Sequence, residues 1–131
     1  MPLRRRLPVF RPARNSPPPV PDLDQIHRDY RRALPDKRDA LRRAWEALCA
    51  EEASSDQVGQ VHLLLHRLVG SAGTYGYPRI ATLARSLEQD WVAWKAASVE
   101  GRPPPYEVCA RQAGIMAELL TELLDASDAP D

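Results

Sequence analysis

From Asp22 onward, apolar residues recur every three to four positions, and no stretch of strand length alternates apolar with polar residues. Such a repeat is typical of helices that bury one face and expose the other. Charged residues interrupt every apolar segment before it reaches the roughly 18 residues that a membrane span needs. The sequence therefore predicts an all-α fold that does not span a membrane, and we expect no membrane partner.

Helix-breaking residues divide this region into five expected helices. Pro35 is expected to end the first, because proline lacks the N–H that a helix interior needs. Ser54, followed by Gln57, matches a capping box at the start of the third helix. Gly76 suits the left-handed position after a helix, and Pro78 suits the first turn of the next one. The expected helices cover residues 22–34, 36–52, 54–75, 78–99 and 106–125.

The four longer helices are joined by short turns, which predicts an antiparallel up-down four-helix bundle. The shorter first helix is expected to be an N-terminal lead-in that caps one end. The chain of 131 residues is near the usual size of one domain, and residues 1–21 hold seven of its 13 prolines. We expect a disordered Pro/Arg-rich leader at 1–21, the bundle at 22–126, and a frayed acidic tail at 127–131.

Charge and cysteine content limit the classes of function. The 18 Lys and Arg residues balance the 18 Asp and Glu residues, but five of the arginines precede Asp22, so the body is net acidic. That distribution argues against a folded domain that binds nucleic acid. Cys49 and Cys109 fall on apolar helical stripes, so we expect free thiols in a reducing compartment and a cytoplasmic protein.

The third expected helix has a polar face of unusual composition. At about 100° per residue, its core stripe consists of Val61, Leu65, Leu68, Ala72 and Tyr75. The residues that cluster away from this stripe are Gly59, His62, His66, Gly70 and Gly73. We therefore expect the His66 side chain to point to solvent, with glycines one and two turns further along.

Each glycine inside a helix costs about 0.5–1 kcal/mol relative to alanine, so Gly70 and Gly73 need a reason. One interpretation is that they leave a flat approach by which another macromolecule reaches the ring of His66. The alternative is that they permit close helix packing, although their side of the helix is expected to be the wrong one for it. We favour the first interpretation.

The residues around His66 resemble the histidine-containing phosphotransfer (HPt) domain family. The family motif is a histidine, a leucine two residues later, a lysine, a glycine, and a second glycine six residues after the first. His66, Leu68, Gly70 and Gly76 match it, and "LARSLE" resembles part of the family's next helix. The resemblance covers residues 61–88 by motif and residues 36–125 by architecture.

The resemblance implies that His66 accepts and donates a phosphoryl group in a two-component phosphorelay. The implied partners are a response-regulator receiver domain, a hybrid histidine kinase, or both. A neutral imidazole can attack an aspartyl phosphate without a strong base, so the chemistry is plausible in itself. The chain would be a carrier without kinase activity and without a cofactor of its own, since the receiver domain would bring Mg²⁺. The residues expected to contact the partner are His62, Arg67, Val69, Gly70 and Gly73.

One position departs from the family motif. The lysine expected three residues after the histidine is Val69 here, although a cation there would screen the phosphoryl oxygens. Arg85 and Gln89 in the next expected helix lie at about the level of His66, so they are our candidates for supporting the phosphoryl group.

Other interpretations of the same residues stay open. His62 and His66 are one turn apart, a spacing that can hold a metal ion, but no further ligands stand at a recognisable spacing and we expect no metal site. The main alternative is a helical module that docks on a receiver or a histidine kinase without carrying phosphate. We expect a monomer, because the exposed face centres on one histidine.

Overall fold

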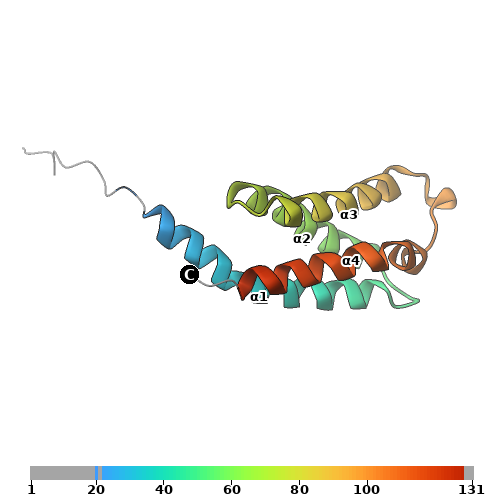
Figure 1. The fold of residues 1–131 in the computed structure, drawn as a ribbon. Helices are drawn as coiled ribbons and strands as arrows, with labels where there is room; N and C mark the ends of the chain where they lie inside the picture. Colours follow the sequence, from blue (N-terminus) through green and yellow to red (C-terminus); the bar gives the residue numbers. More distant parts are fainter. Residues whose placement is uncertain (1–19, 21, 129–131) are drawn as a thin grey trace, which may run out of the picture.

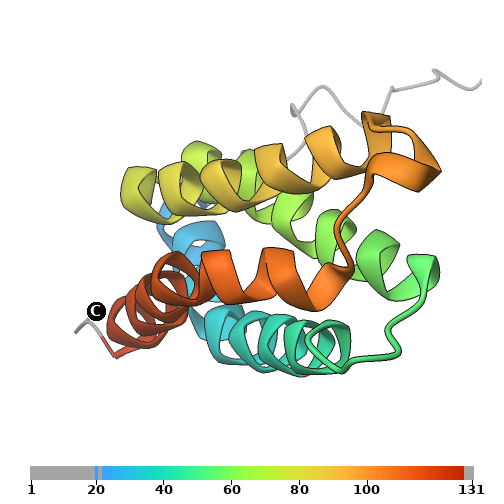
Figure 2. The ribbon, with the colours of Figure 1, turned by 90° about the vertical axis from the view of Figure 1, so that its right-hand side faces the viewer.

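The computed structural model describes residue 20 and residues 22–128. Within this part of the chain there are four α-helices and no strands: α1 (Leu23–Leu48), α2 (Ser55–Thr74), α3 (Pro78–Ala96) and α4 (Pro105–Ser127). A short 3₁₀ turn, Val99–Gly101, precedes α4. Each helix packs on the next, and α4 returns to pack on α1 (Figures 1 and 2). The predicted all-α four-helix bundle is confirmed.

Two expectations concern residues at the chain ends. The disordered leader falls on residues 1–21, all but one of which lie outside the described residues. The frayed tail was expected from residue 127, but α4 includes Ser127 and its C-cap is Asp128. Residues 129–131 lie outside the described part.

The expected helix break at Pro35 is wrong, because α1 is one helix that contains this proline. Its buried residues stand on one stripe on both sides of the proline: Tyr30, Leu34, Leu41 and Leu48. Burying a leucine stabilises a fold by about 1.5–3 kcal/mol, so the three buried leucines together exceed the cost of about 3 kcal/mol for proline inside a helix. The helix bends between its blue and teal parts in Figure 1, as a proline kink predicts. It also ends at Leu48, earlier than the expected Glu52.

The expected signals around α2 are confirmed. The backbone N–H of Ser54 donates to Gln57 Oε1 at 2.7 Å, as a capping box requires. At the other end Gly76 has a φ of +87°, and the N–H of Tyr77 donates to the carbonyl of Ala72 at 2.8 Å. Pro78 then starts α3. These contacts make a tight turn that sets α2 and α3 antiparallel to each other.

Within the part of the chain that the structure describes, the buried core includes the amide side chain of Gln112, which is 1% exposed. Its Oε1 accepts a hydrogen bond from the buried Trp91 Nε1 at 3.0 Å, and its Nε2 donates to the carbonyl of Leu87 at 3.1 Å. Gln112 faces inward, whereas the neighbouring Ala113 is exposed. The amide can be buried because α3 gives it the hydrogen bonds that burial demands.

None of the helices in the described residues combines the length and the apolar composition of a membrane span. The three tryptophans lie in the core or at its edge: Trp91 is fully buried, and Trp45 and Trp94 are half-buried against it.

Candidate functional site

His66 lies in the middle of α2 and points away from the core, as the sequence predicts. Its side chain is 70% exposed. The opposite face of α2 is buried through Val58, Val61, Leu65, Leu68 and Ala72. The apolar stripe therefore determines the direction of His66, because the two sets of residues occupy different sides of one rigid helix.

The imidazole of His66 is oriented by Glu88 on α3. His66 Nδ1 lies 2.9 Å from Glu88 Oε2, and the Glu88 side chain is only 15% exposed. A carboxylate can only accept a hydrogen bond, so we assign the proton of the ring to Nδ1. In that tautomer Nε2 keeps its lone pair, and none of the described residues forms a hydrogen bond with that nitrogen.

A second histidine continues this arrangement toward the start of α2. Lys95 Nζ donates to His62 Nδ1 at 2.8 Å, and His62 Nε2 lies 3.9 Å from Glu88 Oε2. The rings of His62 and His66 are 6.4 Å apart and roughly perpendicular. We call His62, His66, Glu88 and Lys95 the His66 network. Burial lowers the pKa of His62, and the ammonium of Lys95 lowers this pKa further, so His62 is neutral near neutral pH.

A hollow of about 430 Å³ opens beside the ring of His66. The residues that line it come from α2 and the end of α3: Gly59, His62, Leu63, His66 and Lys95. We call it the His66 hollow. It places a nucleophilic nitrogen and an ammonium group on one open surface.

The two glycines after His66 differ in their surroundings. A Cβ built at Gly70 would meet no atom within 4 Å, so this position is bare and open. A Cβ at Gly73 would lie 3.9 Å from the Cβ of Ala81 on α3. Our expectation that both glycines face away from any packing partner is therefore wrong for Gly73, because the flank of α2 that bears it leans toward α3.

Two other residues expected to contact a partner lie on the flanks of α2. Arg67 is exposed and lines a smaller pocket of about 220 Å³ that it shares with residues of α1. Val69 is half-buried and packs against the core. Whether they contact a partner stays a prediction.

The α3 residues that the structure joins to His66 are not the ones that we selected. Arg85 and Gln89 are exposed, and neither side chain forms a hydrogen bond or an ion pair within the described residues. Glu88 and Lys95 were missed. One signal in the sequence pointed to Glu88. Tyr77 lies in the turn between the two helices, His66 lies eleven residues before Tyr77, and Glu88 lies eleven residues after Tyr77. Antiparallel helices bring residues at equal distances from their turn to the same level.

Metal binding has no support in the described residues, which contain no group of three or more His, Cys, Asp or Glu side chains arranged to hold an ion. The His62 Nδ1 atom already accepts a hydrogen bond from Lys95. The pair of histidines is therefore better described as part of a hydrogen-bonded network.

Three other nucleophilic side chains, Cys49, Cys109 and Ser71, have reactive groups that are at least partly buried or hydrogen-bonded. Cys49 and Cys109 are free thiols, and burial raises the pKa of both, so they stay protonated at neutral pH. The hydroxyl of Ser71 shares a hydrogen bond of 2.7 Å with the hydroxyl of Tyr30. These groups are poorer candidates for group transfer than the exposed His66.

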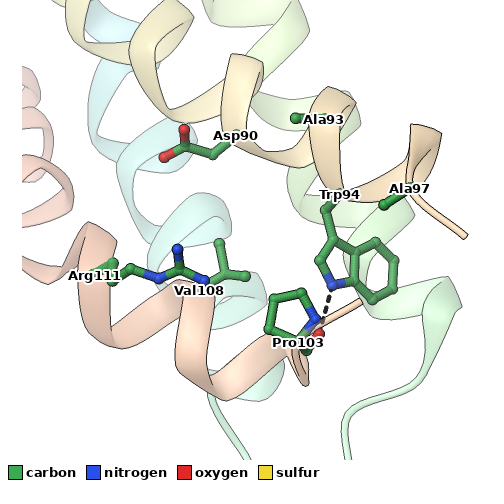
Figure 3. A pocket seen from close by; sticks show the side chains of 7 residues that line it. All are labelled: Asp90, Ala93, Trp94, Ala97, Pro103, Val108 and Arg111. Carbon is green, nitrogen blue, oxygen red and sulfur yellow. Dashed lines mark hydrogen bonds between the residues drawn. The ribbon is translucent and has the colours of Figure 1, made fainter. Parts of the chain in front are cut away.

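A further pocket of about 390 Å³ lies between α3 and α4 (Figure 3). Asp90 and Arg111 stand at one end, and at the other Trp94 Nε1 donates to the carbonyl of Pro103 at 2.7 Å. No histidine, cysteine or serine lines this pocket. It offers charge and an indole surface, but it lacks a nucleophile for covalent chemistry.

Comparison with known proteins agrees with the all-α fold. The family model described as "Hpt domain" matches residues 25–129, which covers nearly all of the four helices. No curated protein and no solved structure matched the chain.

Proposed function

Because the chain belongs to the Hpt domain family, we propose that it carries a phosphoryl group on His66 and exchanges it with an aspartate of a receiver domain. One observation carries this proposal. The hydrogen bond between His66 Nδ1 and Glu88 Oε2 leaves Nε2 with a lone pair on a ring that is 70% exposed. A partner protein can therefore bring a phosphorus atom directly to this nitrogen.

The proposed transfer follows from the tautomer. The Nε2 lone pair attacks the phosphorus of an aspartyl phosphate, a P–N bond forms, and the P–O bond breaks with its electron pair on the aspartate oxygen. The ring then carries a positive charge, which the Glu88 carboxylate stabilises through the Nδ1–H bond. Transfer in the reverse direction returns the pair of the P–N bond to Nε2 and leaves a neutral imidazole.

This role requires little else from the chain. In-line phosphoryl transfer depends mainly on positioning and on stabilisation of charge, and the Mg²⁺ of a receiver domain would supply part of the latter. We propose a carrier rather than a kinase, with a receiver domain, a hybrid histidine kinase, or both as partners. We further propose that a monomer suffices, because the exposed surface centres on one histidine, His66. The free thiols favour a cytoplasmic location.

The test is to incubate the chain with a panel of phosphorylated receiver domains and to measure acid-labile phosphate on it. We expect the wild-type chain to accept phosphate from at least one receiver and His66→Gln to accept none. His27→Gln is the matched control, since His27 is an exposed histidine on α1 and should leave transfer unchanged. Circular dichroism should show equal helicity for all three proteins.

Failure of the wild-type chain to accept phosphate from any receiver would contradict the proposal. The alternative, a pure binding module, predicts a different result for phosphate uptake by the wild-type chain. It would bind a receiver equally well as wild type and as His66→Gln, and neither protein would carry phosphate. Half-buried Val69 at the position of the motif lysine is the observation that keeps this second function under test.

A further inference from the structure

The proposed phosphoryl group has no cation at the position where the family motif would supply one. Val69 follows His66 by three residues, and it packs against the core instead of presenting a charge. A positively charged side chain lies near His66 on the other side, toward the start of α2. Lys95 reaches there from the last turn of α3 and lines the His66 hollow together with His66 itself.

We propose that Lys95, positioned by His62, stabilises the phosphoryl group on His66 and takes over the role of the cation missing at Val69. This inference rests on the proposed function and names the residues that support it. It replaces Arg85 and Gln89, which the sequence suggested for this role, because their side chains make no hydrogen bond or ion pair within the described residues.

The geometry of the Lys95 ammonium suits this role. An ammonium group has three N–H donors, and one of them is directed at His62 Nδ1 at 2.8 Å. The two other donors remain for oxygens that enter the hollow. His62 stands between the ammonium and Glu88, with its Nε2 atom 3.9 Å from Glu88 Oε2. This placement holds the lysine apart from the carboxylate and keeps it available to the phosphoryl group.

The charges of the His66 network lead to the same assignment. Before transfer, the Glu88 carboxylate and the Lys95 ammonium balance each other, and both histidines are counted as neutral. A phosphoryl group brings about two negative charges close to a carboxylate that is only 15% exposed, and the positive charge of the phosphorylated ring offsets about one of them. Of the residues that line the hollow, Lys95 is the one with a permanent positive charge. Without it, the phosphorylated site would hold an excess of about two negative charges, which Lys95 reduces to about one.

His62 acts as a positioning residue in this scheme. Its lowered pKa keeps the ring neutral, so Nδ1 can accept the hydrogen bond from Lys95. A protonated His62 would carry N–H groups on both nitrogens and would repel the ammonium. The function of His62 is thus to fix the lysine and not to bind phosphate.

The test uses phosphoramidate, a small donor that phosphorylates a histidine without a docking partner. The Nε2 lone pair attacks its phosphorus, the P–N bond of the donor breaks, and ammonia leaves. We expect Lys95→Ala to form phosphohistidine about fivefold more slowly or worse, which is the effect of one unit charge at about 4 Å in water. Lys95→Arg keeps the charge and should recover most of the rate. The rate of phosphohistidine formation in His62→Ala should lie between the rates of Lys95→Ala and wild type.

The matched control is Lys37→Ala, which removes the other lysine of the chain from α1. It should leave the rate at the wild-type value. Equal rates for wild type and Lys95→Ala would overturn the inference while leaving the carrier function intact. A wild-type chain that takes up no phosphate on His66 from phosphoramidate or from receivers would overturn both. A loss in Lys95→Ala that Lys95→Arg does not recover would also count against a charge effect.

Discussion

Substitutions of Gly70 should affect the stability of the fold and the transfer of phosphate in opposite directions. This glycine lies inside α2, and a Cβ added to it would meet no atom within 4 Å. Alanine at such a position gains helix propensity without a steric cost. We expect Gly70→Ala to raise the free energy of unfolding by about 0.5–1 kcal/mol, which corresponds to about 2–6 °C in Tm.

The same bare surface is where we propose that a receiver domain approaches His66. A larger side chain that is also a good helix former, as in Gly70→Gln, should keep the fold and obstruct that approach. A displacement of about 1 Å between reacting groups can cost about 100-fold in rate. We therefore expect transfer from a receiver to fall by about tenfold or more, whereas labelling by phosphoramidate stays near the wild-type rate.

Gly114→Ala is the control for the stability effect. Gly114 lies in α4, and a Cβ there would also meet nothing within 4 Å. It should gain similar stability and leave transfer from the receiver unchanged. Urea unfolding measures the stability of each variant. The rates of labelling by a phosphorylated receiver and by phosphoramidate measure partner-dependent and partner-independent phosphorylation. A loss of stability in Gly70→Ala, or an undiminished receiver rate in Gly70→Gln, would refute this reasoning.

Two further predictions concern the core and the pH dependence. Gln112→Leu leaves the buried Trp91 N–H without its acceptor and should cost about 1–3 kcal/mol in urea unfolding, and adding Trp91→Phe should recover part of that loss. The folded chain binds a proton on His62 less readily than the unfolded chain, because burial and the facing charge of Lys95 lower its pKa against the opposing effect of Glu88. Stability should therefore decline as the pH falls below the ordinary histidine value of 6.5, and His62→Gln should flatten this decline in unfolding measured from pH 5 to 8. A Gln112→Leu protein as stable as wild type, or an unchanged pH profile in His62→Gln, would contradict the corresponding argument.

The features that could be predicted from the sequence are those determined locally. The outward direction of His66 follows from the stripe on its own helix. The capping box at Ser54 and the left-handed turn at Gly76 depend on neighbouring residues alone. Each of these signals was confirmed, because no distant contact competes with it.

The features that were missed depend on distant contacts. The helix continues through Pro35 because Tyr30 and Leu34 on one side of it and Leu41 on the other are buried by helices elsewhere in the chain. The position of Gln112 reflects an indole on another helix. Glu88 and Lys95 acquire their roles only once α2 and α3 are aligned, so residue type and helical spacing within one segment could not select them.

The alignment of α2 with α3 determines how the His66 ring is oriented. The whole His66 network belongs to one continuous hairpin, and the turn at Gly76, with its φ of +87°, fixes how the two helices are paired. Sliding α3 by one helical turn would carry Glu88 about 5.4 Å along α2 and would free the His66 ring to rotate. The choice of which imidazole nitrogen reacts is thus determined ten residues away, by a backbone conformation that other residue types rarely adopt.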